Sequence, residues 1–171
     1  MSQTANTGKA FKDDQQQHSQ KYLTFLLGDK TFAVSILQVK EIMEYGTVTH
    51  IPRMPDFIYG AINLRGKVVP VVDLMQRLEN NGCEISKRSC IVIVELKYSE
   101  EAINIGIIVD AVSKVMDFNV GDIEPAPSFG GNIQTDFIEG MGKLDDQFVV
   151  LLNINNILSM KDLALLNEVQ N

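Results

Sequence analysis

The chain has 171 residues, a length that suits one domain or two small ones. Hydrophobic residues make up 45% of it and charged residues 22%, which excludes a wholly disordered chain. The net charge of -7 disfavours a nucleic-acid partner, because an acidic surface repels phosphate backbones. Only Cys83 and Cys90 are present, with no nearby pair of histidines, so neither a disulfide scaffold nor a zinc site is indicated.

The N-terminal segment and the apolar runs bear on the cellular compartment. Residues 1–20 are rich in Gln, Ser, Thr, Asn and Lys, so we expect a flexible tail there. This segment lacks the apolar stretch of a signal peptide. The longest apolar runs, 90–94 and 148–152, are far shorter than the roughly 20 residues that cross a bilayer. We therefore expect a cytoplasmic protein that does not insert into membranes.

From Lys21 onward, short β-rich runs alternate with turn residues. Two pairs of runs are typical of hairpins, one around the turn at 28–30 and one around the turn at 65–67. Pro70 has no backbone N–H, so we expect it at a strand edge or at a bulge. Strands are predicted, in chain order, at residues 22–27, 31–35, 39–48, 61–64, 68–72, 90–96, 103–109 and 148–154.

Helices are scarce in the pattern. Residues 73–78 favour one or two helical turns. A C-terminal helix over about 156–168 is predicted from the capping-box spacing of Ser159 and Asp162, followed by an apolar face at Leu163 and Leu166. Many short strands with Gly and Pro turns favour small barrels or a sandwich over a parallel α/β sheet.

An internal repeat refines this prediction. Residues 56–74 align without a gap on residues 136–154, and Asp, Phe, Ile, Gly, Leu and one Val coincide. Chance similarity between two β-rich segments is the alternative. We favour two similar small barrels, spanning about 21–82 and 83–155, with strand exchange between them left open.

The sequence carries few signs of catalysis. It has no GxSxG, Walker A, HExxH or GxGxxG motif. The acidic pairs at 100–101 and 145–146 fit hairpin turns better than paired catalytic carboxylates, because adjacent strand residues point to opposite faces. His50 fits a surface or packing role better than that of a general base. We therefore predict no enzyme activity, no catalytic residue, no metal and no cofactor.

Two residues stand out as candidates for binding. Arg65 lies at a predicted hairpin tip, where it is either a solvated turn residue or a planar donor for a partner's carboxylates and carbonyls. Phe129 lies in a loop rich in Pro and Gly, and it is either tucked under that loop or an exposed interface anchor. The pattern alone leaves both choices open.

Several blocks in a fixed order resemble the CheW-like chemotaxis coupling proteins. They are FIYGAINLRGKVVPVVDL at 57–74, IIVDAVSKV at 107–115 and IEPAP at 123–127. The resemblance runs from about Gln20 to Leu166 and defines a CheW-like domain at 21–168. It implies a mainly β fold of two packed five-stranded SH3-like β-barrels with a C-terminal helix, and a non-enzymatic adaptor.

The resemblance also implies partners and surfaces. The family links the cytoplasmic tips of methyl-accepting chemoreceptors to the regulatory domain of the histidine kinase CheA, so the chain would be recruited to membrane receptor arrays. The receptor-binding residues would be Ile36, Val39, Gly60, Arg65, Val112 and Val115. The kinase-binding residues would be Glu41, Ile42, Met43, Tyr45 and, in a loop that closes ring-like assemblies, Phe129.

Two other functions compete with the adaptor. A small-ligand-binding β-barrel would keep a pocket with polar groups among apolar walls. A minor hydrolase would use the acidic turn residues. The adaptor instead predicts filled barrels and exposed apolar surface near Val39, Val115 and Phe129.

Overall fold

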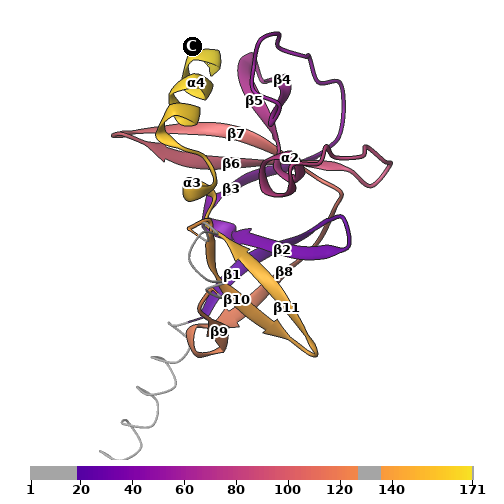
Figure 1. Cartoon of the computed structure of the whole chain (residues 1–171), viewed down its shortest axis with the longest axis vertical. Helices are drawn as coiled ribbons and strands as arrows, with labels where there is room; N and C mark the ends of the chain where they lie inside the picture. Colours follow the sequence, from indigo (N-terminus) through magenta and orange to yellow (C-terminus); the bar gives the residue numbers. More distant parts are fainter. Residues whose placement is uncertain (1–18, 127–135, 171) are drawn as a thin grey trace, which may run out of the picture.

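The computed structural model describes residues 19–126 and 136–170 (Figure 1). Within them the fold is mainly β, as predicted, with two sheets stacked one above the other in the view of Figure 1. No helix among these residues is long and apolar enough to span a membrane.

The lower sheet in Figure 1 has six strands and combines strands from the N-terminal and C-terminal parts of the chain. Its first hairpin, β1–β2, pairs Leu27 with Lys30 across the predicted turn. Strand β2 then pairs in parallel with β11, so N-terminal and C-terminal strands share one sheet. In spatial order the strands are β8 (Ala111–Asn119), β1 (Ser19–Leu27), β2 (Lys30–Ser35), β11 (Gln147–Leu152), β10 (Ile138–Leu144) and β9 (Ile123–Glu124).

The upper sheet has five strands and likewise combines distant segments. The predicted hairpin around Arg65 is β4–β5, and β5 pairs in parallel with β7. Strands from the two predicted barrel spans, 21–82 and 83–155, are therefore mixed in both sheets. In spatial order the strands are β3 (Val39–Glu44), β6 (Cys90–Tyr98), β7 (Glu101–Val109), β5 (Lys67–Asp73) and β4 (Ile58–Leu64).

The resemblance implied two five-stranded barrels, whereas the lower sheet has six strands. The two-residue strand β9 pairs with β10, with Glu124 opposite Met141, and adds a sixth strand at the edge. A strand this short leaves no run of β-rich residues for sequence reasoning to detect. Among the described residues, backbone pairing does not join the two edge strands of either sheet.

Pro70 lies in a strand that is an inner strand of its sheet but is unpaired on one side at this residue. The strand is β5, in which Pro70 lies opposite Ala61. Pairing between β5 and β7 begins only at Val71, so the missing N–H of Pro70 falls where β5 has a partner on one side only. The strand is thus locally an edge at this residue.

The hairpins β4–β5 and β10–β11, which come from the sequence repeat, share their construction. In each, the register shifts by a bulge near the start of the first strand. In each, the residue after the paired segment donates its N–H to a phenylalanine carbonyl before the first strand. Asp73 bonds Phe57 and Asn153 bonds Phe137, both at 2.7 Å.

Short helices cap the strands. Where the sequence predicted one C-terminal helix over 156–168, the structure has two helices separated at Leu158 and Ser159. The predicted capping box is present: the Asp162 N–H donates to Ser159 Oγ at 3.1 Å, and the Ser159 N–H donates to Asp162 Oδ2 at 3.0 Å. The helical segments are η1 (Ile36–Gln38), α2 (Leu74–Glu79), η2 (Val120–Asp122), α3 (Ile154–Ile157) and α4 (Met160–Gln170).

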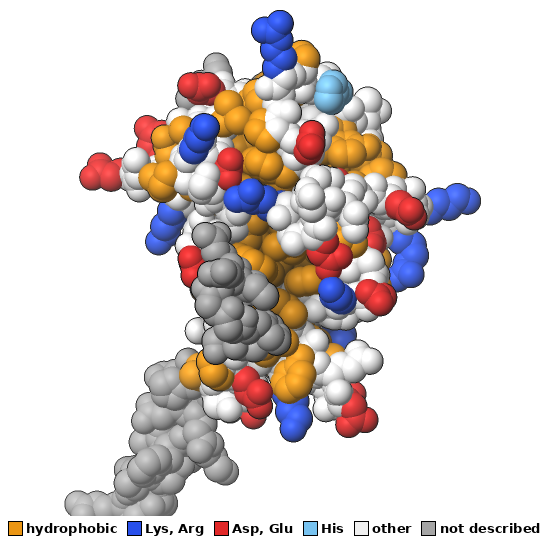
Figure 2. All heavy atoms as spheres, in the orientation of Figure 1, with side chains coloured by type: hydrophobic (Ala, Val, Ile, Leu, Met, Phe, Trp, Pro, Cys, Tyr) orange, Lys and Arg blue, Asp and Glu red, His pale blue; other side chains and the backbone are white. Residues whose placement is uncertain are grey.

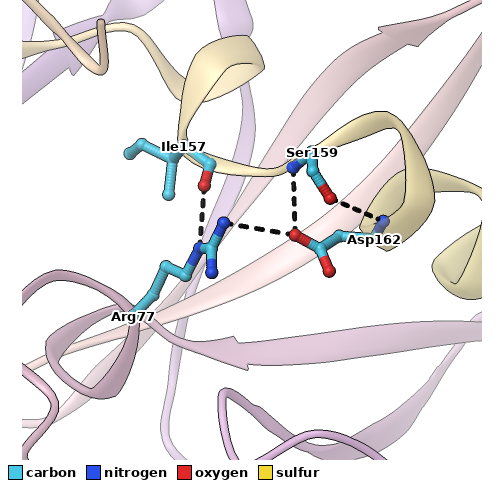
Figure 3. A network of polar contacts seen from close by, with 4 residues as sticks. All are labelled: Arg77, Ile157, Ser159 and Asp162. Atoms are coloured by element: carbon cyan, nitrogen blue, oxygen red, sulfur yellow. Dashed lines mark hydrogen bonds and ion pairs between the residues drawn. The ribbon is translucent and has the colours of Figure 1, made fainter. Parts of the chain in front are cut away.

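Arg77 of α2 fastens the C-terminal helices to the upper sheet (Figure 3). Its Nε donates to the carbonyl oxygen of Ile157 at 2.8 Å, and its Nη2 lies 3.2 Å from Asp162 Oδ2. Its guanidinium also lies over the ring of Phe57, 5.1 Å from the centroid. One side chain therefore joins α2, α3 and the first turn of α4.

The core has three parts. A main cluster lies between the sheets and draws on both, including Phe25 and Phe32 from the lower sheet and Val92 and Ile105 from the upper one. A second cluster belongs to the upper sheet alone and a third to the lower sheet. Each curled sheet therefore has its own apolar interior and packs on the other through the main cluster.

Candidate protein-interaction site

Arg65 lies in the two-residue turn between β4 and β5, flanked by the paired residues Leu64 and Lys67. Arg65 has a φ of +51° and Gly66 a φ of +84°. Two positive φ values in a two-residue loop are typical of the type I′ turn, whose twist suits a hairpin. The side-chain oxygen of Asn63 accepts the Gly66 N–H at 2.9 Å and fixes the turn. The arginine thus projects from a rigid tip.

An ion pair joins this tip to the opposite edge of the same sheet. Arg65 Nη2 lies 2.8 Å from Oε2 of Glu41, which belongs to β3. The arginine side chain is 74% exposed and that of Glu41 31%. The family resemblance implied that Arg65 binds receptors and Glu41 the kinase, whereas the structure brings the two residues into direct contact. Because β3 and β4 are the two edge strands, the contact also shows how strongly the sheet curls.

A pair of tyrosines bridges the same two edges. Tyr45 follows β3 and Tyr59 lies in β4, and their rings pack edge to face with centroids 6.3 Å apart. The Tyr45 hydroxyl donates to the Tyr59 hydroxyl at 3.2 Å. Burial, with this hydrogen bond, raises the pKa of Tyr45 to about 12. The two rings border a surface hollow of about 430 Å³, which His50 also lines.

Strand β3 alternates between exposed and partly buried residues. Glu41, Met43 and Tyr45 are partly buried, and Met43 and Tyr45 pack against the second cluster. Ile42 points the other way and is 44% exposed. Of the residues predicted to bind the kinase, Ile42 is therefore the one that offers apolar surface on this edge strand.

The apolar residues predicted to bind receptors lie around η1 and β8. Ile36, Val39 and Val112 are partly buried against the main cluster, whereas Val115 is 50% exposed. In the lower sheet, β1 lies between β8 and β2, and β2 leads into η1. Figure 2 shows apolar side chains exposed among charged ones on the face drawn, over both sheets.

Sequence reasoning missed the most exposed large apolar side chain among the described residues. Leu37 in η1 is 90% exposed. The Ser35 hydroxyl accepts the Leu37 N–H at 3.3 Å and caps this single turn. Such a turn has a signal in the sequence, because a serine precedes three residues that break the alternation of the flanking strands. This signal could not reveal that Leu37 would point into solvent.

Gly60, predicted to bind receptors, is buried and tightly packed. A Cβ at this position would collide with the carbonyl oxygen of Thr49 and lie 2.8 Å from Cγ1 of Val48. Thr49 and Ala61 exchange two backbone hydrogen bonds here, at 2.9 and 2.8 Å. Close approach of two backbones therefore accounts for the glycine. Phe129 lies outside the described residues.

Comparisons with known proteins identify the family. Residues 21–162 match the model of the CheW-like domain. The chain belongs to the CheW-like family. It is 35% identical to the chemotaxis protein CheW of Klebsiella aerogenes over 150 residues, covering 88% of each chain. It is 34% identical to the chemotaxis protein CheW of Bacillus subtilis over 140 residues, covering 81% of this chain and 86% of that protein.

Two further relatives extend this result. The protein FrzA of Myxococcus xanthus is 30% identical over 146 residues, covering 84% of this chain and 88% of that protein. The crystal structure of the scaffolding protein TtCheW from Thermoanaerobacter tengcongensis superposes with a TM-score of 0.73 at 36% identity, covering 82% of this chain and 88% of that one. The resemblance found in the sequence is thereby confirmed.

Proposed function

We propose that this chain joins the cytoplasmic tips of methyl-accepting chemoreceptors to the regulatory domain of a CheA-type histidine kinase. As a member of the CheW-like family, the chain is a chemotaxis coupling adaptor, and its relatives give no support to the alternative of a small-ligand-binding barrel. We further infer that it acts without catalysis, in the cytoplasm at membrane receptor arrays. We also infer that the two curled sheets are SH3-like barrels.

The Arg65–Glu41 pair is the observation that supports this proposal best. The Arg65 guanidinium accepts no hydrogen bonds and can donate five, and among the described residues it makes one short contact, to Glu41. At 74% exposure the remaining donors face solvent, where they can meet carboxylates or carbonyls of a partner. The Glu41 contact holds the guanidinium in position, which lowers the entropy lost on binding.

Exposed apolar side chains occur close in sequence to Glu41, with Ile42 on the opposite face of the strand. Ile42 follows Glu41 directly, and Leu37 precedes the same strand by two residues. Large apolar side chains at 44% and 90% exposure are the kind that lose water when a partner docks. A rim of charged groups around apolar anchors is the usual composition of a protein interface.

The arrangement also bears on how signals are coupled. Val39 from the predicted receptor set and Glu41 and Ile42 from the predicted kinase set lie on one short strand. Arg65 contacts this strand from the opposite edge of the sheet. A receptor that moves Arg65 would therefore change the surface that β3 offers to the kinase, because Arg65 contacts Glu41 on that strand.

A binding experiment with matched variants tests the proposal. Purified adaptor is titrated by calorimetry with the kinase regulatory domain and, separately, with a receptor cytoplasmic fragment. Ile42→Ser is expected to weaken kinase binding about tenfold, as loss of about 1.4 kcal/mol of apolar contact would. Ile85→Ser is the control, because Ile85 is 40% exposed in the loop before β6 and belongs to neither set.

The outcomes separate clearly. Equal kinase affinity for the Ile42 and Ile85 variants would remove β3 from the kinase surface. No measurable binding of the wild-type chain to either partner would refute the coupling function itself.

A further inference from the structure

The loop between α2 and β6 contains an Asn–Gly step that the proposed adaptor surfaces do not use. Asn81–Gly82 is the one Asn–Gly step in the whole sequence. Both residues are exposed and follow Asn80, which ends α2 in the left-handed conformation with a φ of +59°. The backbone at Gly82 is uncrowded, because a Cβ there would meet no atom closer than 3.9 Å.

The reacting groups of this step are not held by hydrogen bonds. Within residues 19–126 and 136–170, neither the Asn81 side chain nor the Gly82 N–H has a hydrogen-bond partner. The neighbouring Asn80 differs, because its side-chain oxygen accepts from the Gln76 amide at 3.1 Å and its N–H donates to the Gln76 carbonyl at 3.0 Å. The two asparagines are therefore adjacent in sequence, but hydrogen bonds hold only the first of them in place.

We propose that Asn81 is a site of non-enzymatic deamidation, one of the reactions that make asparagine thermolabile. The Gly82 nitrogen gives its proton to solvent and bonds to Cγ of Asn81, while the Cγ–Nδ2 bond breaks and the side-chain amide leaves as ammonia. Water then opens the succinimide ring at one of its two carbonyls, which yields aspartate or isoaspartate. One water is consumed, one ammonia is released, and no atom is oxidised or reduced. Gly82 favours the closure because it has no side chain to hinder its nitrogen.

Deamidation adds a negative charge to the loop that the buried carboxylate of Asp73 holds in place. Asp73 is 3% exposed; its Oδ1 accepts the Gln76 N–H at 3.1 Å and its Oδ2 the Cys83 N–H at 2.9 Å. This carboxylate therefore fixes both the first turn of α2 and the start of the loop. A second carboxylate two residues before Cys83 repels it. Isoaspartate also adds one carbon to the backbone between residues 81 and 82, which shifts Cys83 relative to its acceptor.

A matched variant isolates the step. Gly82→Ala keeps both asparagines and hinders only the attacking nitrogen. A Cβ at Gly82 would lie 3.9 Å from Oε1 of Gln76 and 4.0 Å from Oδ2 of Asp73, which are ordinary van der Waals distances, and the φ of Gly82 is not in the left-handed region. The variant is therefore expected to fold as the wild type does.

The full-length wild type and Gly82→Ala are incubated at neutral pH and physiological temperature, and digested with trypsin at intervals. The peptide of residues 78–87 contains both Asn80 and Asn81, and its fragmentation assigns the replaced amide and distinguishes isoaspartate. We expect aspartate and isoaspartate to accumulate at Asn81 while Asn80 stays amidated. In Gly82→Ala the rate falls at least roughly tenfold, which corresponds to about 1.4 kcal/mol of activation free energy.

Equal rates in the two proteins, or reaction concentrated at another asparagine, would overturn the assignment of the site. The effect on the anchor has its own readout, since hydrogen exchange at the Cys83 amide reports its bond to Asp73. We expect faster exchange at Cys83 in Asn81→Asp than in the wild type. Unchanged exchange there would overturn the proposed weakening of the loop.

Discussion

Exchanging the charges of Glu41 and Arg65 separates their contact with each other from any contact with a partner. The single variants Glu41→Arg and Arg65→Glu each break the 2.8 Å ion pair and place like charges together. The double variant restores opposite charges at the same two positions with the polarity reversed. A role that lies only within the adaptor would be rescued in the double variant, whereas recognition by a partner would not.

The magnitude expected for folding is small. With side chains 74% and 31% exposed, the pair belongs to the class of surface ion pairs, which contribute about 0.2–1 kcal/mol. For a chain of this size, 1 kcal/mol corresponds to about 2–4 °C in Tm, so each single variant should melt within a few degrees of the wild type. The double variant should return most of that difference.

The magnitude expected for binding is larger. Loss of a charged hydrogen bond at an interface costs about 1.5–3 kcal/mol, or roughly ten- to hundredfold in affinity. Reversing the charge adds repulsion from the partner groups that faced the guanidinium. We therefore expect Arg65→Glu and the double variant to bind receptor fragments at least roughly tenfold more weakly than the wild type.

The assay is calorimetric titration with receptor fragments and with the kinase regulatory domain, beside thermal melting. Lys30→Glu is the control, since Lys30 and Glu79 form an ion pair of the same 2.8 Å length with side chains 62% and 35% exposed. That variant should lose similar stability and no affinity. Full rescue of receptor binding in the Glu41→Arg/Arg65→Glu variant would refute the assignment of Arg65 to a partner contact.

Three further predictions follow from buried or packed groups. Burial raises the pKa of the Cys83 thiol from its ordinary value of 9 to about 12. Burial, together with the hydrogen bond to Tyr59, raises the pKa of the Tyr45 hydroxyl from its ordinary value of 10 to about 12. The unfolded chain therefore loses these protons first, so the free energy of unfolding should fall as pH rises from about 9 to 12, and Cys83→Ser should flatten the slope in chemical denaturation. Arg77→Ala should lower the free energy of unfolding by about 1–3 kcal/mol through the lost bonds to the C-terminal helices, measured by urea titration; a change below the error of that titration would contradict the fastening role. Gly60→Ala should destabilise the fold far more than Gly121→Ala, because a Cβ meets backbone at the first site and nothing within 4 Å at the second; equal melting temperatures would show that Gly60 is not held by packing.

The hairpins could be predicted because their signals are local. The turn residues at 28–30 and 65–67 are flanked by apolar runs, and the observed pairing joins Leu27 to Lys30 and Leu64 to Lys67. The capping box of α4 was predicted for the same reason, since both partners lie within one helical turn. Interactions between residues that are close in the sequence can be recognised from the residue types and their spacing.

The order of strands and the contacts between edges could not be predicted in this way. The parallel pairing of β2 with β11 depends on how the whole sheet assembles. The Arg65–Glu41 contact depends on the curl of five strands that bring β3 and β4 close together. Such contacts follow from global packing, so residues assigned from sequence to separate faces proved to be neighbours.

The sequence repeat shows which feature of the Arg65 tip the fold requires and which it leaves free. Asp145 occupies the equivalent turn of the β10–β11 hairpin, and its φ of +52° nearly equals the +51° of Arg65. Since a short acidic residue adopts the same backbone conformation at the same place, the turn does not require an arginine. The left-handed conformation is unusual for a side chain as long as that of arginine, and Asn or Asp would be favoured on local grounds. What an arginine adds at this turn is its guanidinium, with the bond to Glu41 and the donors that remain in solvent.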